Sequence, residues 1–161
     1  MQEDLVIYKE DYEIIKTVLD RLTRNTKAEI SFITDIEGHC IAATGRQDES
    51  ELNSISSLIA GSVAAVESIA QMLNIQRFSN ILTESDDKNL YISDINKKIM
   101  LIVVFGKSSN IGLVRLRVKN AREELAKIFE QINRKIEKEM YDQGSPFDSV
   151  SDEEIDEIFG D

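Results

Sequence analysis

Seven consecutive apolar residues decide the fold class of this 161-residue chain: Ile99-Met100-Leu101-Ile102-Val103-Val104-Phe105. The run is the longest apolar stretch in the sequence and is far shorter than the roughly 18 apolar residues of a membrane span. A strand that is apolar at every position is typical of the centre of a sheet whose two faces are both covered. We therefore expect residues 99–105 to form a central, fully buried strand.

Four further β-type runs are separated by polar turns. Turn residues at 35–38 predict a β-hairpin between the first two runs, and polar turns at 84–88 and 96–98 separate the later ones. In chain order the four runs are residues 28–34, 39–43, 78–83 and 89–94. Together with the central run they give five extended segments.

Three amphipathic segments complete the pattern. Acidic side chains in the first turn favour helix starts near Glu10 and Asp48, and apolar residues then recur at helical spacing to about residues 26 and 74. After Gly106 the alternation of residues 111–118 suggests a strand, but the helical period continues to Ile136. We therefore predict one long helix there, with Ser108 or Ser109 as its N-cap.

The second predicted helix carries two stripes on opposite faces. Its apolar stripe, expected to cover the sheet, comprises Leu52, Ile55, Leu58, Ile59, Val66, Ile69 and Leu73. The opposite stripe contains only small residues, namely Ser57, Ala60, Gly61, Ala64 and Ser68. The presence of Gly61 requires an explanation, because a glycine inside a helix lowers stability by about 1 kcal/mol relative to alanine. Small residues let backbones approach each other, so we interpret this stripe as an interface; packing against another helix of the chain and plain exposed surface are the alternatives.

The formal net charge of −11 is concentrated at the C-terminus. Residues 141–161 hold eight of the 30 acidic side chains and no basic one, which leaves 22 acidic against 19 basic side chains in residues 1–140. An acidic balance opposes binding to nucleic-acid phosphates and to anionic membranes. We therefore divide the chain into a domain of residues 1–140 and a flexible acidic tail of residues 141–161.

The tail ends in a short amphipathic motif. Residues 151–154 match a capping box, and Ile155, Ile158 and Phe159 then form one apolar edge. Helices shorter than about 12 residues are marginal alone, so we expect this segment to fold only on a surface of its own domain or of a partner. A tail that merely increases solubility is the competing interpretation.

A run of basic residues marks another candidate surface. Lys107, Arg115, Arg117, Lys119 and Arg122 follow one another with no acidic residue between them. We regard this basic edge as a candidate binding surface, and a solvated helix edge as the alternative.

No motif for catalysis is found. Gly106-Lys107-Ser108-Ser109 resembles the end of a phosphate-binding loop, but the glycine required five residues earlier is Leu101. His39 and Cys40 are neighbours on a predicted strand and so point to opposite faces. The chain has one histidine and one cysteine, too few for a soft-metal site. We expect a non-enzymatic protein without cofactor or metal, and the lone cysteine and the absence of a signal pattern in the first residues indicate a cytoplasmic location.

Three segments together resemble the roadblock family of dynein-light-chain-like proteins, and within it the bacterial MglB branch. They are residues 33–45 (Ile-Thr-Asp-Ile-Glu-Gly-His-Cys-Ile-Ala-Ala-Thr-Gly), residues 57–65 (Ser-Leu-Ile-Ala-Gly-Ser-Val-Ala-Ala) and residues 112–118 (Gly-Leu-Val-Arg-Leu-Arg-Val). The order of elements agrees over about residues 8–138, and residues 145–160 are similar to tails on some members.

The resemblance implies an α+β sandwich. Its five-stranded antiparallel sheet would carry the second helix on one face and the first and last helices on the other. Such domains form homodimers through the second helix and the third strand, here including Phe78 and Ile81, and assembly beyond a dimer stays open. The resemblance further implies that the dimer binds a small Ras-like GTPase of the MglA type and accelerates its GTP hydrolysis without an arginine finger, in bacterial cell polarity or gliding motility.

Two other functions remain open at this point. The hairpin followed by a helix also resembles the start of small-molecule sensor domains, which need a ligand cavity. A roadblock-type scaffold subunit that assembles partners without affecting GTP hydrolysis is the other alternative.

Overall fold

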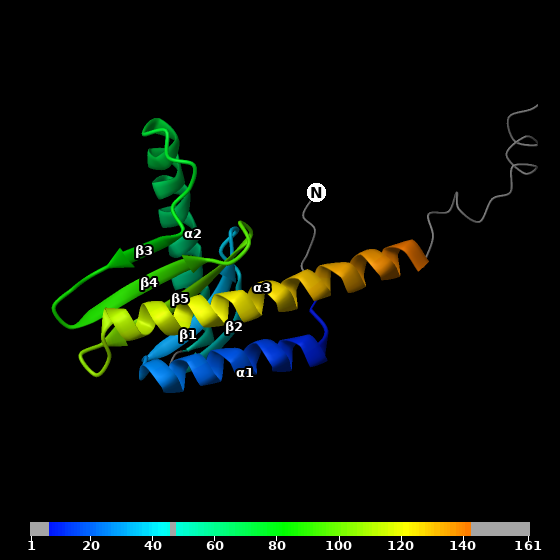
Figure 1. Cartoon of the computed structure of the whole chain (residues 1–161), viewed down its shortest axis with the longest axis horizontal. Coiled ribbons are helices and arrows are strands. Elements are labelled where there is room, and N and C mark those ends of the chain that lie inside the picture. Colours follow the sequence, from blue (N-terminus) through cyan, green and yellow to red (C-terminus); the bar gives the residue numbers. More distant parts are fainter. Residues whose placement is uncertain (1–6, 46–47, 143–161) are drawn as a thin grey trace, which may run out of the picture.

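The computed structural model describes residues 7–45 and 48–142, and its helices and strands follow the predicted order (Figure 1). The elements are α1 (Lys9–Thr26), β1 (Ile30–Asp35), β2 (Cys40–Gly45), α2 (Glu49–Met72), β3 (Asn80–Thr83), β4 (Lys88–Asp94), β5 (Ile99–Gly106) and α3 (Ile111–Asp142). Since α3 continues to Asp142, the predicted domain boundary at residue 140 falls within its last turn. The rest of the acidic tail lies outside the described residues.

The five strands form one antiparallel sheet in the order β2-β1-β5-β4-β3. The apolar run of residues 99–105 lies in β5, at the centre, where Ile102 is paired with Phe32 of β1 and with Ile92 of β4. This position explains why β5 is apolar throughout: both of its faces are buried under helices. The predicted sheet and its central strand are confirmed.

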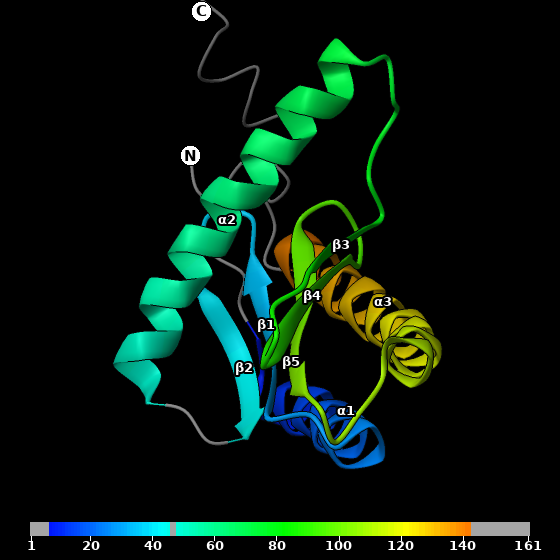
Figure 2. The same cartoon turned by 90° about the vertical axis from the view of Figure 1, so that its left-hand side faces the viewer.

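Helices cover both faces of the sheet (Figure 2). Alternate residues of β5 point to opposite sides, so that Leu101 and Val103 pack in a core with α1 and α3, whereas Met100 and Ile102 pack in a core with α2. The predicted arrangement, with the second helix on one face and the first and last helices on the other, is therefore confirmed.

Only part of α2 lies on the sheet. Leu52 and Ile59 are buried against it, and Val63 and Val66 still lie beside sheet residues, but the C-terminal end of the helix extends beyond the sheet (Figures 1 and 2). Leu58, Ile69 and Leu73, which we expected to cover the sheet, are exposed. Leu58 and Ile69 each adjoin a buried residue, Ile59 or Ala70, and therefore point about 100° away from the sheet-facing side of the helix.

By length and composition alone, α2 is apolar enough to cross a membrane, but only a small share of it is buried, and its N-terminal half is packed against the sheet. A helix that covers one sheet face and exposes a second apolar side passes the same test. The apolar composition of α2 is therefore accounted for by two sides of the helix, one packed on the sheet and one exposed.

Two local expectations are wrong. The N-cap of α3 is Asn110, whose side-chain oxygen accepts a hydrogen bond from the Leu113 N–H at 2.9 Å, and not Ser108 or Ser109. Phe78 precedes β3, which begins at Asn80. Because the boundary of an element depends on the hydrogen bonds at its last residues, the apolar pattern locates it only to within a few positions.

Candidate partner-binding surface

The small residues of α2 lie on the side of the helix that is turned away from the sheet. We call the set the small face; it consists of Ser57, Ala60, Gly61, Ala64 and Ser68, of which Ala60 is half-buried and the others are exposed. A Cβ atom added at Gly61 would meet no atom within 4 Å. No close packing among the described residues therefore requires this glycine, and the alternative that the face packs against another helix of the same chain is not supported.

Ser57 differs from the other members because it also contacts the β1–β2 turn. Its hydroxyl donates to the carbonyl of Asn53 at 3.1 Å and approaches that of Gly38 at 3.4 Å. Gly38 has φ +94°, and a Cβ atom there would lie 2.7 Å from the Ser57 Cα. The turn itself is held by Asp35, whose carboxylate accepts the N–H groups of Glu37 and His39. Ser57 thus joins the helix to the hairpin at the start of the small face.

A second exposed surface lies on a different side of α2. We call it the apolar flank; it consists of Leu58, Ala65, Ile69 and Met72, whose spacing places them on one side of the helix. Leu58, Ile69 and Met72 are 74%, 51% and 84% exposed. Leu73, Ile75 and Phe78, which lie at the end of α2 and in the segment that leads to β3, are also exposed. Sequence periodicity missed this flank, because a broad apolar stripe does not show where the sheet ends.

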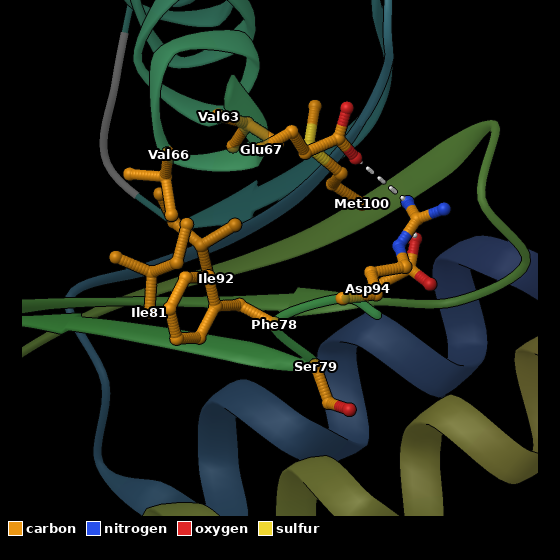
Figure 3. A pocket seen from close by; sticks show the side chains of 10 residues that line it. Val63, Val66, Glu67, Phe78, Ser79, Ile81, Ile92, Asp94 and Met100 are labelled. Carbon is orange, nitrogen blue, oxygen red and sulfur yellow. Dashed lines mark hydrogen bonds and ion pairs between the residues drawn. The ribbon is translucent and has the colours of Figure 1, made fainter. Parts of the chain in front are cut away.

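Among the described strands, β3 forms one edge of the sheet and is paired only with β4. Its outer backbone groups are therefore available for another strand. Ile81 lies in β3 and is half-buried, whereas Phe78 lies before the strand, where its ring packs near Val66 and Ile81 (Figure 3). Of the two predicted dimer-strand residues, only Ile81 belongs to the strand.

The cavities among the described residues are small. The one beside Phe78 (Figure 3) has a volume of about 20 Å³, and a hollow between α1 and α3 has a volume of about 140 Å³. Sites for metabolites or cofactors usually have volumes of about 300 Å³ or more. Neither of these two cavities has the volume that the sensor alternative requires.

The predicted basic edge is divided between two sides of α3. Arg115 and Arg122 lie near Tyr91 of β4, and helical spacing places Lys119 on the same side. Burial raises the pKa of the Tyr91 hydroxyl, and the two arginines partly oppose this rise. Arg117, in contrast, lines the hollow between α1 and α3. Residues two positions apart on a helix point in nearly opposite directions, so the unbroken basic run does not form one surface.

The described contacts of His39 and Cys40 do not join the two side chains, since the Cys40 thiol donates to the Ala42 carbonyl at 3.9 Å. The nearest carboxylate to the His39 ring is that of Asp35, with Nδ1 3.1 Å from Oδ2, and Glu37 lies at 3.8 Å. These three side chains are close enough together to contact one ion. However, the Asp35 carboxylate already accepts two backbone hydrogen bonds in the turn, so the cluster is accounted for by the hairpin. Burial raises the pKa of the Cys40 thiol, which disfavours the reactive thiolate.

The tail residues Ile155, Ile158 and Phe159 lie outside the described residues. Their proposed contact with a partner or with the domain therefore stays a prediction.

Comparison with known proteins identifies the family. Residues 14–105 match the Roadblock/LC7 domain family. MglB of Myxococcus xanthus is 37% identical, with a TM-score of 0.74 over 80% of this chain and 96% of that chain. No curated protein matches the sequence.

Two other solved structures agree over a similar length. The gliding protein MglB of Thermus thermophilus is 28% identical, with a TM-score of 0.75 over 81% of this chain and 99% of that chain. A structure described as MglB with tetrameric arrangement is 27% identical, with a TM-score of 0.76 over 82% of this chain and 99% of that chain. The sheet order, the distribution of the helices and these matches agree that the chain belongs to the roadblock family and is similar to MglB.

Proposed function

We propose that the protein is a homodimeric, non-enzymatic regulator that stimulates GTP hydrolysis by a small Ras-like GTPase of the MglA type. The observation that carries the proposal is the small face of α2, which covers several helical turns and has no close packing partner at Gly61. Similarity to MglB supports the choice of a GTPase as the partner. The description of the Thermus relative as a gliding protein supports a role in bacterial motility or cell polarity.

The dimer would form through the β3 edge and the apolar flank. Two β3 edges can pair and extend the sheet, because their outer N–H and C=O groups are available. Burial of Ile69 and Met72 against a second copy would remove exposed apolar surface from water at about 25 cal/mol per Å². The relative with a tetrameric arrangement supports assembly of such domains, including assembly beyond a dimer.

The GTPase would contact the small face. Side chains of this size let the backbone of a partner come close to the helix, and Gly61 offers the closest approach because nothing lies within 4 Å of its added Cβ position. The protein would act by holding the catalytic groups of the GTPase in position, since positioning and electrostatic stabilisation account for most of the rate of phosphoryl transfer. This division assigns separate sides of α2 to the second copy and to the GTPase.

Replacing Ala64 by arginine tests the proposal. The longer, charged side chain should block the GTPase, so we expect stimulated GTP turnover to fall about tenfold or more. The control is Glu123→Arg, which adds the same side chain at an exposed position of α3, on the other side of the sheet. Sedimentation and circular dichroism should show an unchanged dimer and fold for both variants. Full stimulation by the Ala64→Arg variant would rule out the small face as the GTPase site.

The scaffold alternative predicts a different result for the wild-type protein. A scaffold would bind the GTPase without changing its rate of hydrolysis. Binding and turnover should therefore be measured on the same preparation, because binding without stimulation favours the scaffold.

A further inference from the structure

The end of α2 after Val66, residues 67–72, extends beyond the sheet and is mostly exposed; we call it the overhang. Beyond Val66, which lines the small cavity, the only buried residue of this helix is Ala70. The turn that follows the helix is closed locally, because the Ile75 N–H donates to the Ala70 carbonyl at 2.8 Å. This hydrogen bond ends the helix but does not connect it to the sheet. Packing of the earlier turns sets the axis of the helix, and contacts made after the helix can hold its end, with Ile69 and Met72, against the sheet.

Arg77 makes that connection. Its guanidinium Nη2 lies 2.9 Å from Oδ1 of Asp94 at the end of β4 and 3.3 Å from Oε1 of Glu67 on α2. Figure 3 shows Glu67 on the helix and Asp94 on the strand. The dashed lines mark the two ion pairs that their carboxylates form with the guanidinium between them. One cation thus links the helix, the connecting segment and the sheet.

The strand end of this link is itself well fixed. The Asp94 carboxylate also accepts the N–H of Lys97 at 3.0 Å, and the Asp94 N–H donates to the carbonyl of Ser79 at 3.0 Å. The Arg77 and Asp94 side chains are only 26% and 20% exposed. Partly buried ion pairs are screened less by water and salt than exposed pairs. The attraction between Arg77 and Asp94 is therefore screened less than that of a fully exposed ion pair.

Without Arg77, two carboxylates would face each other without a cation between them. Glu67 and Asp94 would then favour separation, and the helix end is the partner that can move because it projects beyond the sheet. Phe78 still packs near Val66 and Ile81 in the cavity. Loss of the arginine should thus loosen the overhang without unfolding the domain.

We infer that Arg77 is a positioning residue that fixes the overhang of α2 relative to β4, and with it Ile69 and Met72 of the apolar flank relative to the β3 edge. The inference rests on the proposed dimer, in which both surfaces must meet a second copy at the same time. In the proposed dimer, Arg77 does not itself contact the second copy. It affects dimer formation by holding the end of α2 in position.

Hydrogen exchange and dimer affinity of an Arg77→Met variant test the inference. We expect amides of residues 67–78 to exchange about tenfold faster, and the dimer dissociation constant to rise about tenfold, since hydrogen bonds to charged groups contribute about this much. Amides of β1 and β5 should be unchanged. Arg77→Lys should restore part of both effects, because an ammonium group can still lie between the carboxylates.

Arg134→Met is the matched control. Arg134 forms an exposed ion pair with Glu130 on α3, at 2.7 Å between Nη2 and Oε1, and its loss should change neither measurement. Wild-type exchange in residues 67–78 of the Arg77→Met variant would overturn the inference. So would faster exchange throughout the sheet, which would indicate a general structural role. A wild-type dissociation constant combined with faster exchange would overturn the link to the dimer.

The exchange measurement needs only the isolated protein and therefore does not depend on the GTPase. If the wild-type protein is monomeric, the proposed dimer fails, but exchange in residues 67–78 still decides whether Arg77 fixes the helix. If the dimer forms and stimulates no GTPase, the proposed function fails and both measurements on Arg77 remain decisive.

Discussion

Gly38 and Gly61 occupy very different environments. Gly38 turns the chain between β1 and β2 with φ +94°, and the backbone of Ser57 lies where its side chain would begin. Gly61 has ordinary helical geometry and open space around it. The first glycine is needed by the fold of the described chain, whereas the second has no such role within it.

Alanine substitutions should separate these two roles. Gly38→Ala combines an unfavourable positive φ with a backbone clash, and we expect it to lower the free energy of unfolding by about 2 kcal/mol or more. Gly61→Ala should raise it by up to about 1 kcal/mol, because alanine favours the helix. Urea unfolding followed by circular dichroism measures both changes. Equal effects of the two substitutions would contradict the close contact between Gly38 and Ser57.

Cys40 gives the fold a dependence on alkaline pH. Burial raises the pKa of its thiol above the ordinary value, so the thiolate forms first in the unfolded chain. The stabilisation from the buried neutral thiol is complete below the unfolded pKa and is lost as the pH rises through the folded pKa. As the pH rises above the ordinary thiol pKa of about 8.5, the wild-type protein should therefore lose more stability than Cys40→Ala. Parallel pH profiles of thermal unfolding for the two proteins would contradict this expectation.

At the scale of single elements, α3 shows how a cap is chosen. Asn110, Ser109 and Ser108 all have side chains that can cap a helix, but only Asn110 bonds the Leu113 N–H. The Ser109 hydroxyl is buried and has no hydrogen-bond partner within the described chain. The choice depends on the direction in which the chain leaves β5.

The two substitutions at this cap should have different effects. Asn110→Ala should reduce the free energy of unfolding by about 1 kcal/mol, because the Leu113 N–H loses its acceptor. Ser109→Ala should be neutral or slightly stabilising, since it removes a buried hydroxyl that makes no hydrogen bond. Denaturant unfolding distinguishes the two variants. A larger loss of unfolding free energy for Ser109→Ala than for Asn110→Ala would support Ser109 as the N-cap, as expected from the sequence.

The two sides of α2 should likewise respond differently to substitution. Ile59 is buried against the sheet and Ile69 lies on the exposed apolar flank. Ile59→Ala should destabilise the fold by about 2–4 kcal/mol through lost burial and a cavity. Ile69→Asp should leave the unfolding of the monomer nearly unchanged and weaken the proposed dimer, as sedimentation equilibrium would show. A fully dimeric Ile69→Asp variant would exclude the flank from the dimer contact.

At the scale of the whole molecule, α1 and α3 are joined by ion pairs as well as by the core. The Lys135 ammonium lies 3.1 Å from the carboxylate of Asp11, which is buried, and Arg21 lies 2.6 Å from Glu124. The Tyr8 hydroxyl donates to the carboxylate of Glu139. These contacts run along much of α3 and hold it against α1 up to the residues that precede the tail.

Removal of residues 145–161 tests the predicted contact of the tail. If the apolar residues Ile155, Ile158 and Phe159 dock on a GTPase or on the dimer while the acidic residues steer the approach, the truncated protein should bind the GTPase more weakly or show a changed nucleotide preference. The difference should shrink as salt screens the charges. Titration calorimetry at low and at physiological salt measures it. Identical affinities of the two proteins in both buffers would contradict a binding role.

Much of the fold could be predicted because its patterns are local. Alternation in the strands, helical spacing in the helices and the apolar run of β5 each depend on residues within one element. The small face was also predictable, since side-chain size and helical spacing are both written in the sequence. The apolar flank was not, because Leu58 and Ile69 are apolar like the buried Ile59, and only their position relative to the sheet separates them.

The sequence by itself determined the number, type and order of the elements, the central position of β5 and the concentration of acidic residues at the C-terminus. The tertiary structure alone decided that the C-terminal end of α2 extends beyond the sheet, that Arg117 is separated from Arg115 and Arg122, and that Arg77 links Glu67 to Asp94. The physical reason is the sequence separation of the contacts involved. Secondary structure follows from contacts within a few residues, whereas these surfaces depend on where strands and helices distant in the chain begin, end and pack.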